Sequence, residues 1–487
     1  MEVFVRIEHV NLKVRNRVIL ADLSWQMAKG EQWLLNGASG SGKTMLAKAM
    51  AGLGRVNGKI NVHYDPTSNL AASTLFVPQW FQFKDKQGSS NFYFQQRFNS
   101  ADAENTVTVW ESLLEYATKI NRTAYSAQAL LTTFGLSSRK DAAIIQLSSG
   151  EHKKLQLIKA LLYRPQFLIL DNPYTGLDVQ SRACLNDQLE HACTNGMQLL
   201  IVSNDAAIPA CVNRYAALVD GKLVTSHQPI HIAETTGHNY ELPDFLQEAP
   251  ALPLEELVSM KNVNIRYGEK QILKDISWSL KSGEKWLLKG QNGSGKSTLI
   301  SLLTGDNPQA YAQEIYLFGR KRGSGESIWD IKKQIGFISP ELQWYFEPGS
   351  TVFQAVASGL FDTTGLFRKL SPQQTAKTNA LIELFGLENE ANDLLTHLPL
   401  GKQRLALLAR AIIKNPPLLI LDEPCQGLDE AQTNMFNQLV ELLCNTNRSL
   451  IYVNHFEHAL PHFLTHELIL EEGVATRNKI ILEKEYT

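Results

Sequence analysis

Two glycine-rich segments have the residue types and the spacing that can hold a chain of phosphates. Residues 37–44 read GASGSGKT and residues 290–297 read GQNGSGKS, and both fit the pattern G-x-x-x-x-G-K-[S/T]. In such a loop glycine lets backbone N–H groups curl around phosphate, the lysine meets the outer phosphates, and the hydroxyl faces a magnesium ion. We therefore predict two sites for ATP and Mg²⁺, formed by Gly37, Gly40, Gly42, Lys43 and Thr44 in the first segment and by Gly290, Gly293, Gly295, Lys296, Ser297 and Thr298 in the second.

Two aspartates are candidates for completing the metal sites. The apolar runs FLILD, at residues 167–171, and LLILD, at residues 418–422, end in Asp171 and Asp422. An aspartate after a strand is most often a turn residue or a helix cap. The two phosphate loops nevertheless favour metal ligands here, and we predict that Asp171 acts with Thr44 and Asp422 with Ser297.

An internal repeat indicates which elements position these residues. Residues 10–25 (VNLKV…ILADLSW) return at residues 263–278 (VNIRY…ILKDISW), and the match continues through both phosphate loops. Each copy alternates short apolar runs with helical stretches, which is typical of an α/β domain with a mostly parallel sheet. We predict two tandem P-loop NTPase domains, at residues 1–233 and 257–487. The acidic, proline-containing residues 234–256 are expected to form an extended linker with little structure of its own.

The composition argues against several other classes of protein. The net charge is −2, so the surface has no overall basic bias toward nucleic acid, although a local basic patch stays open. There are five cysteines and no C-x-x-C pair, which leaves a disulfide framework or a zinc site poorly supported and favours the reducing cytoplasm. The N-terminus lacks an apolar signal core, and the apolar runs are too short to span a bilayer. We therefore expect any membrane-spanning part to belong to a separate subunit.

Three further motifs resemble those of a known family. LSSGE (residues 147–151), LILDNPYTGLD (168–178) and LILDEPCQGLD (419–429) are similar to the signature and the second nucleotide motif of ATP-binding-cassette (ABC) ATPases. The resemblance covers nearly the whole chain in two copies. It implies two cassettes that hydrolyse ATP, each with a parallel-sheet core and with antiparallel β and helical subdomains. It also implies that the cassettes pair head to tail within the chain, with each ATP between the phosphate loop of one and the signature of the other.

The resemblance assigns most of the family's functional residues to one composite site. This site, called site two, combines the second phosphate loop with the N-terminal signature. Its catalytic residues would be Glu423, which activates the attacking water, His455, the switch histidine, and Lys296. The expected contacts to ATP from outside the phosphate loop are Tyr267, which stacks on adenine, and the signature residues Ser148 and Gly150, which lie at the positive end of a helix.

The other composite site, called site one, departs from the family pattern. Asn172 stands at the position of the catalytic carboxylate and Asn204 at that of the histidine. An amide cannot accept a proton at neutral pH, and the loss of a general base costs about 10²–10⁴ in rate. The partnering signature reads LPLGK, with Pro399 in the serine position and Lys402 at the end. We predict that site one holds ATP while site two turns over. The alternative is a divergent family with relaxed motifs.

Three other features leave alternatives open. Gln79 matches the glutamine of the family's Q-loop and is expected to contact ATP, whereas the second copy has Pro340 there, with Glu341 or Gln343 as a substitute. The basic residues 318–333 and the aromatic residues 91–105 could dock a partner or a nucleic-acid strand, or be a solvated turn and a subdomain core. Cys425, beside Glu423, is either a site of inhibitory oxidation or a plain buried cysteine.

The two unusual stretches and the domain order are similar to a tandem type of ABC ATPase that is associated with molybdate uptake genes and with photorepair. The leading interpretation is the energy-coupling ATPase of a transport system, with a molybdate-type cargo implied by the resemblance alone. The alternative is an ABC ATPase that acts in nucleic-acid repair or translation without a transporter. A third is an orphan ATPase whose activity is limited to nucleotide-driven closure.

Overall fold

The computed structural model describes the chain apart from residues 1, 15–16, 39, 55, 80–106, 205–207, 220, 231–239, 249–253, 269, 292, 341, 343–345, 347–348, 429, 446, 455–459 and 481–487. It separates into two compact units that divide between Glu234 and Thr235, here called the N-terminal and the C-terminal cassette. Each cassette contains a six-stranded sheet and a smaller antiparallel sheet.

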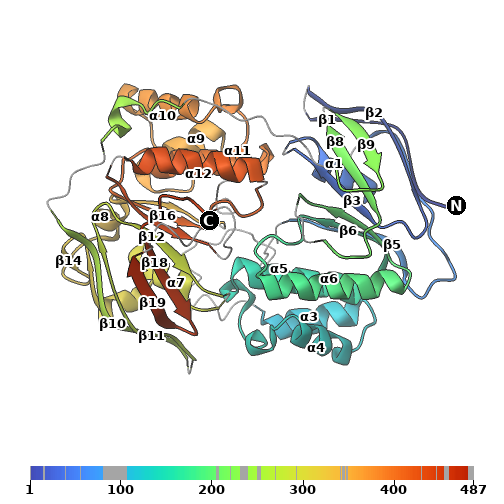
Figure 1. Cartoon of the computed structure of the whole chain (residues 1–487), viewed down its shortest axis with the longest axis horizontal. Coiled ribbons are helices and arrows are strands. Elements are labelled where there is room, and N and C mark those ends of the chain that lie inside the picture. The colour runs from blue at the N-terminus through green and yellow to red at the C-terminus, as the bar shows by residue number, and fades with distance from the viewer. Residues whose placement is uncertain are drawn as a thin grey trace. The chain divides into compact units, whose positions relative to one another are not determined.

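The N-terminal cassette is built on the six-stranded sheet β5-β6-β7-β3-β8-β9, which is parallel except for its last strand (Figure 1). A second, antiparallel sheet has the order β2-β1-β4. The strands are β1 (Val3–Val14), β2 (Arg17–Ala28), β3 (Trp33–Gly37), β4 (Asn57–Val62), β5 (Ala71–Val77), β6 (Pro165–Asp171), β7 (Gln198–Val202), β8 (Arg214–Val219) and β9 (Lys222–Ser226). The helices are α1 (Lys43–Met50), α3 (Val109–Lys119), α4 (Ala124–Thr133), α5 (Ser149–Tyr163) and α6 (Val179–Thr194).

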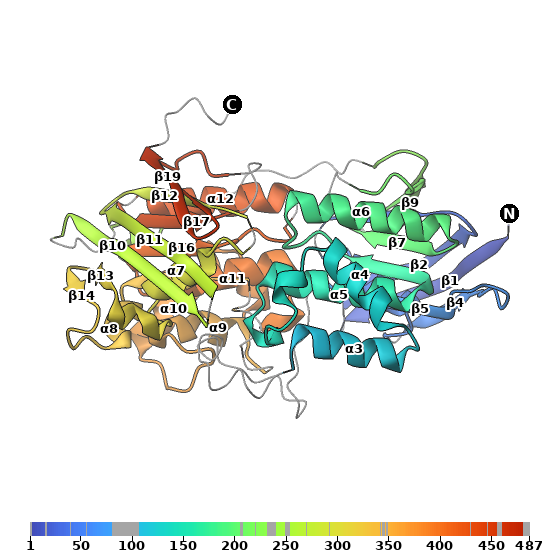
Figure 2. The same ribbon diagram turned by 90° about the horizontal axis from the view of Figure 1, so that it is seen from below.

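Burial on both faces explains the apolar run at residues 167–170 of strand β6. All seven of its residues are buried. Leu168 and Leu170 pack with α5 and α6 on one face of the sheet, whereas Phe167 and Ile169 pack with α1 and the antiparallel sheet on the other (Figure 1, Figure 2). A central parallel strand covered on both faces favours apolar side chains on both of its sides, as at residues 167–170. The strand then delivers Asp171 at its carboxyl end.

The C-terminal cassette repeats this arrangement with the six-stranded sheet β15-β16-β17-β12-β18-β19 and the antiparallel sheet β11-β10-β13-β14. The strands are β10 (Glu256–Tyr267), β11 (Lys270–Lys281), β12 (Lys285–Lys289), β13 (Glu314–Leu317), β14 (Arg320–Lys321), β15 (Ile335–Ile338), β16 (Leu418–Asp422), β17 (Ser449–Val453), β18 (His466–Glu471) and β19 (Val474–Ile480). The helices are α7 (Lys296–Leu303), α8 (Ile328–Lys332), α9 (Val352–Ser358), α10 (Pro372–Leu384), α11 (Leu400–Ile412) and α12 (Glu430–Cys444). Helices α9 to α12 share one core with the sheet, and α7 shares the other with β10 and β11. The predicted α/β fold with two tandem cassettes is confirmed.

Part of the predicted linker has more structure than its composition suggested. Asp244–Leu246 form a short 3-10 helix, and Leu246 is fully buried in the core of the C-terminal cassette. Lys377 of α10 lies 5.1 Å above the ring of Phe245, and Asn415 donates a hydrogen bond to the carbonyl of Glu248 (2.8 Å). The sequence predicted a linker with little structure of its own, and residues 244–248 add to that a short 3-10 helix and contacts with the C-terminal cassette. Leu246 joins the core, and Leu242 and Phe245 pack against it, which the proline content of the segment did not indicate.

Candidate nucleotide sites

The two phosphate loops connect a buried strand to a helix in the same way. Strand β3 leads to α1 through the first loop, and β12 leads to α7 through the second. Gly42 and Gly295 precede the helices with φ angles of 101° and 105°, a region that side chains rarely adopt. A Cβ atom at Gly42 would lie 2.7 Å from Ile19, and one at Gly295 would lie 2.7 Å from Leu273. Glycine is therefore required at both positions by conformation and by space.

Each loop lysine folds over its own loop. Lys43 Nζ donates hydrogen bonds to the carbonyls of Gly37 and Ala38, the second at 2.9 Å. Lys296 Nζ donates to Gly290 (2.7 Å) and to Gln291 (2.9 Å). Each ammonium group is thus held by carbonyls of its own loop, and phosphate oxygens could replace these carbonyls as acceptors.

The predicted metal ligands of the N-terminal cassette lie together. Thr44 Oγ1 donates a hydrogen bond to Asp171 Oδ2 (2.9 Å). Asp171 is only 2% exposed, and its Oδ1 atom has no hydrogen-bond partner among the described residues. Burial raises the pKa of this carboxyl, against the opposing effects of Thr44, Lys153 and Lys43. A buried carboxylate oxygen without a partner, next to a hydroxyl, has the chemistry of a Mg²⁺ ligand set.

The corresponding residues of the C-terminal cassette occupy the same elements. Ser297 is exposed in the first turn of α7, followed by the buried Thr298, and Asp422 ends β16. At the carboxylate position the two cassettes share one backbone conformation. Asn172 and Glu423 have φ angles of 43° and 44°. Their N–H groups donate to Val202 (2.8 Å) and Val453 (3.1 Å) on the adjacent strands.

The side chains at this shared position have different partners. Asn172 Nδ2 donates to Gln79 Oε1 (3.3 Å), and Gln79 Nε2 donates to Thr175 Oγ1 (3.4 Å). Glu423 Oε2 instead accepts from Gln426 Nε2 (2.6 Å). A left-handed φ is uncommon for a glutamate and is often found where function over-determines a residue. The structure thus holds a carboxylate in one cassette and an amide in the other at the same point of the backbone.

The N-terminal signature has a complete helix cap. Ser148 precedes α5, and its Oγ accepts from the N–H of Glu151 (3.3 Å), while Glu151 Oε2 accepts from the N–H of Ser148 (2.9 Å). This reciprocal pair fixes the start of the helix that carries Gly150. In the C-terminal cassette, Pro399 precedes α11 and makes no side-chain cap.

In each cassette the helix that begins within the signature has an ion pair in its first turn, but the charges are reversed between the two cassettes. Arg139 Nε donates to Glu151 Oε1 (2.8 Å) in the N-terminal cassette. In the C-terminal cassette Lys402 Nζ donates to Glu390 Oε1 (2.6 Å), with the cation now on the signature helix. The reversal places a positive charge in the first turn of α11, where the helix dipole disfavours cations. Sequence reasoning identified Lys402 but missed its partner, which is 12 residues away.

A buried lysine near the first site was also missed. Lys153 is 3% exposed, and its Nζ donates to the carbonyls of Pro78 (3.0 Å) and Gln79 (3.1 Å). Burial lowers the pKa of Lys153 to about 7, although Asp171 opposes the shift. The lysine therefore links the signature helix to the backbone beside Gln79. Arg404, in the same part of α11, is also fully buried, and two cations in matching places of the repeat are the signal that could have revealed this link.

Other predicted site residues fall into two groups. Asn204 exchanges two hydrogen bonds with Gly37, accepting from its N–H (3.2 Å) and donating to its carbonyl (3.1 Å), and so contacts the first phosphate loop. Tyr267 is 36% exposed at the end of β10, and its hydroxyl accepts from Asn307 (2.9 Å). Outside the described residues lie His455, the possible Q-loop substitutes Glu341 and Gln343, and the aromatic stretch 91–105.

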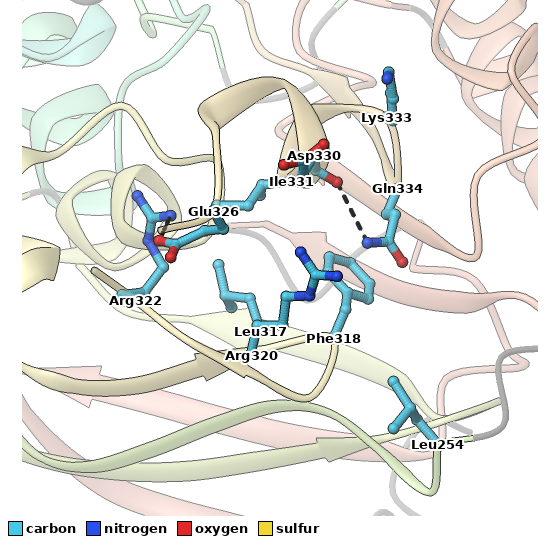
Figure 3. A pocket seen from close by; sticks show the side chains of 10 residues that line it. All are labelled: Leu254, Leu317, Phe318, Arg320, Arg322, Glu326, Asp330, Ile331, Lys333 and Gln334. Atoms are coloured by element: carbon cyan, nitrogen blue, oxygen red, sulfur yellow. Dashed lines mark hydrogen bonds and ion pairs between the residues drawn. The ribbon is translucent and has the colours of Figure 1, made fainter. Parts of the chain in front are cut away.

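The basic stretch of the C-terminal cassette is an ordered turn rather than a fully solvated one. Arg322 Nη1 donates to Glu326 Oε1 (2.6 Å), and these side chains are 1% and 3% exposed. Glu326 also accepts from the N–H groups of Gly323 and Ser324. Arg320 and Lys333 stay exposed and line, with Phe318, Leu317 and other residues, a pocket of about 380 Å³ (Figure 3). Arg322 is thus held in a buried ion pair, whereas its neighbour Arg320 is exposed at the pocket.

Cys425 is partly buried and contacts two buried polar side chains close to Glu423. Its Sγ is 3.4 Å from the hydroxyl of Tyr452, which donates to Asn437 (3.0 Å). Burial raises the pKa of Cys425 to about 12, so the reactive thiolate is scarce at neutral pH. In the N-terminal cassette Tyr174 stands in the same loop and donates directly to Asn186 (2.7 Å). These contacts favour the plain buried cysteine over a site of oxidation.

Comparisons with known proteins agree with this geometry. The sequence matches the family described as ABC transporter at residues 20–175 and 273–426. It is 33% identical over 456 residues to the ABC transporter ATP-binding protein ModF of Escherichia coli (strain K12), which covers 90% of this chain and 91% of that protein. It is 29% identical over 483 residues to an uncharacterized ABC transporter ATP-binding protein of Schizosaccharomyces pombe, which covers 97% of this chain and 99% of that protein.

The predicted family, its tandem arrangement and the likeness to one tandem type are thereby confirmed. Among the described residues, no helix combines the length and the apolar character that crossing a bilayer requires. Two phosphate loops, each between a buried strand and a helix, and two copies of the family match lead to one conclusion: this chain belongs to the ABC transporter family as a tandem ATP-binding-cassette ATPase.

Proposed function

We propose that the chain hydrolyses ATP at one of two unequal sites and uses this turnover to drive a separate membrane-spanning transporter subunit. The observation that carries the inequality is the shared backbone position of Glu423 and Asn172, with φ angles of 44° and 43°. Glu423 presents a carboxylate that can take a proton from water, whereas the amide of Asn172 cannot. Asn172 is also engaged with Gln79, 3.3 Å away.

ATP binding is proposed for both phosphate loops. Lys43 and Lys296 would exchange their loop carbonyls for phosphate oxygens. Bound Mg²⁺ would neutralise phosphate charge, held by Thr44 and Asp171 in one cassette and by Ser297 and Asp422 in the other. The Oδ1 atom of Asp171, for which the described part of the chain provides no hydrogen-bond partner, supports this assignment in the first cassette.

The proposed pairing of the cassettes assigns each signature to the opposite loop. Ser148, in its complete cap, and Gly150 then serve the Lys296 loop at site two, together with Glu423 and His455. The uncapped Pro399 and the positively charged Lys402 serve the Lys43 loop at site one. The defects of both cassettes would thus fall on one nucleotide, which supports slow retention of ATP there and turnover at the other.

Matched substitutions at the shared backbone position test this proposal. Glu423→Gln should lower the steady-state rate of phosphate release by about 10²–10⁴, because it removes the general base. Asn172→Gln, which leaves an amide in place, should keep the rate within a factor of about two of wild type. Nucleotide retained after rapid gel filtration of the wild type should be ATP and should be lost in Lys43→Ala. Wild-type hydrolysis by Glu423→Gln would refute the assignment.

The transport role rests on the family and on the names of relatives, and a molybdate-type cargo rests on resemblance alone. An affinity pull-down with Glu423→Gln and ATP, from separated membrane and soluble fractions, tests it. An integral membrane partner that is absent when Lys296→Ala is used supports transport. Recovery of ribosomes or DNA instead would favour the alternative of an ABC ATPase in translation or nucleic-acid repair.

A further inference from the structure

Two cysteines of the N-terminal cassette lie side by side. Cys193, in the last turn of α6, and Cys211, in the segment between β7 and β8, have their sulfur atoms 3.5 Å apart. The other cysteines have different surroundings. Cys184 contacts the carbonyl of Thr133, Cys425 contacts Tyr452, and Cys444 is fully buried. Within the described part of the chain, Cys193 and Cys211 are therefore the pair within reach of a common bond.

The backbone on both sides of this pair is held in place. Glu190, one turn before Cys193 on α6, accepts a hydrogen bond from the N–H of Ala210 (2.7 Å). The N–H of Val212 donates to the carbonyl of Pro209 (3.1 Å), which closes a turn around Cys211. The turn is thus fastened to the helix independently of the sulfur atoms. Both thiols are partly exposed, so a small reagent can reach them.

The pKa values of the two thiols are shifted in opposite directions. The hydrogen bond between them lowers the pKa of Cys211, with burial and Glu190 acting in the opposite direction. The same hydrogen bond raises the pKa of Cys193, and burial adds to the rise. A thiolate is the form that attacks an oxidant, and Cys211 is assigned the first attack because its pKa is the lowered one of the pair.

We propose that Cys193 and Cys211 are a redox-active dithiol, which a hydroperoxide converts into an intramolecular disulfide. The Cys211 thiolate attacks the peroxide oxygen, the O–O bond breaks, and a sulfenic acid forms with release of water or the corresponding alcohol. The Cys193 sulfur then attacks the sulfenic sulfur, an S–S bond forms, and a second water leaves with the thiol proton. Two thiols are oxidised by two electrons, and one hydroperoxide is reduced.

The disulfide would close a covalent ring that contains residues 193–211. The ring contains β7, which pairs with β3, and Asn204, which holds Gly37 of the first phosphate loop. A cross-link of this span restricts the unfolded chain more than the folded one. Oxidation would therefore stabilise the N-terminal cassette without changing the residues proposed to bind phosphate.

Mass spectrometry of the full-length protein tests the site. After exposure to hydrogen peroxide at pH 7.5, free thiols counted in denaturant should fall from five to three. Trypsin releases residues 183–214 as one peptide with Cys184, Cys193 and Cys211. This peptide should lose two hydrogens, and cleavage after Glu190 should assign the bond to Cys193 and Cys211. Five remaining thiols, a bond through Cys184 or a disulfide-linked dimer would overturn the proposal.

Single variants test the order of the two steps. Cys184→Ser should form the disulfide as the wild type does, and Cys193→Ser and Cys211→Ser should not. Dimedone should trap a sulfenic acid on Cys211 in Cys193→Ser, whereas Cys193 in Cys211→Ser should react at least ten-fold more slowly. Equal trapping would overturn the order. The disulfide should raise the melting temperature of the N-terminal cassette by roughly 5–10 °C, reversibly with dithiothreitol. An unchanged melting temperature in fully oxidised protein would overturn the stabilising effect.

Discussion

Replacing Lys153 by arginine should remove a pH dependence from the stability of the N-terminal cassette. Burial lowers the pKa of Lys153 to about 7, from 10.5 in the unfolded chain. Between these values the unfolded state binds the proton more strongly, so the free energy of unfolding rises with pH. Below pH 7 both states are protonated and the cost of burying the ammonium is fully present. An arginine keeps its charge throughout and cannot relieve that cost.

The size of the effect follows from the pKa difference. One proton bound in the unfolded but not in the folded state adds about 1.4 kcal/mol per pH unit. At pH 7 the folded lysine is half protonated, so the gain between pH 7 and pH 9 is about 2 kcal/mol. For a urea m-value of about 2 kcal/mol/M, this moves the unfolding midpoint by about 1 M. Lys153→Arg should lack this part of the wild-type rise.

Pulse proteolysis in urea, with the surviving peptides assigned by mass spectrometry, can follow each cassette separately. Arginine is a better replacement than methionine because it keeps a cation near Asp171, whose own pKa is raised by burial and lowered by Lys153. It also keeps donors for the carbonyls of Pro78 and Gln79. Peptides of the C-terminal cassette provide the internal control. A Lys153→Arg protein whose N-terminal cassette gains as much stability as the wild type from pH 7 to pH 9 would refute this reasoning.

Two further predictions concern the C-terminal cassette. Leu246→Ala should lower the free energy of unfolding of this cassette by about 2–5 kcal/mol, because removal of a fully buried leucine side chain leaves a cavity. The control Glu248→Ala, at an exposed position, should stay near wild type. Equal urea midpoints for both variants would contradict the packing role of this segment. Glu326→Gln should lower the free energy of unfolding by about 3–5 kcal/mol, because Arg322 would keep a buried charge without its partner. Arg320→Ala, at a nearby exposed position, should change it by less than about 0.5 kcal/mol in thermal unfolding. A small effect of Glu326→Gln would show that this pair is dispensable.

The sequence by itself determined the features that depend on short stretches of chain. The phosphate loops follow from glycines whose φ angles only glycine tolerates well, as at Gly42 and Gly295. The central strands follow from apolar runs buried on both faces, as in β6 and β16. The carboxylates at their ends could be located for the same reason. Local conformation and continuous burial each require particular residue types over a short stretch of chain, so both can be recognised in the sequence. The internal repeat shows each of these patterns twice.

Only the tertiary structure decided which distant side chains meet. Nothing in the spacing pairs Cys193 with Cys211, Lys402 with Glu390, or Lys153 with the carbonyl of Gln79. The burial of Leu246 in the linker could not be predicted, because proline content does not indicate whether a leucine packs into the core of a neighbouring domain. A side chain's partner is set by how helices and loops pack in three dimensions. The packing free energy comes from many contacts spread over the chain, so a single motif does not record it.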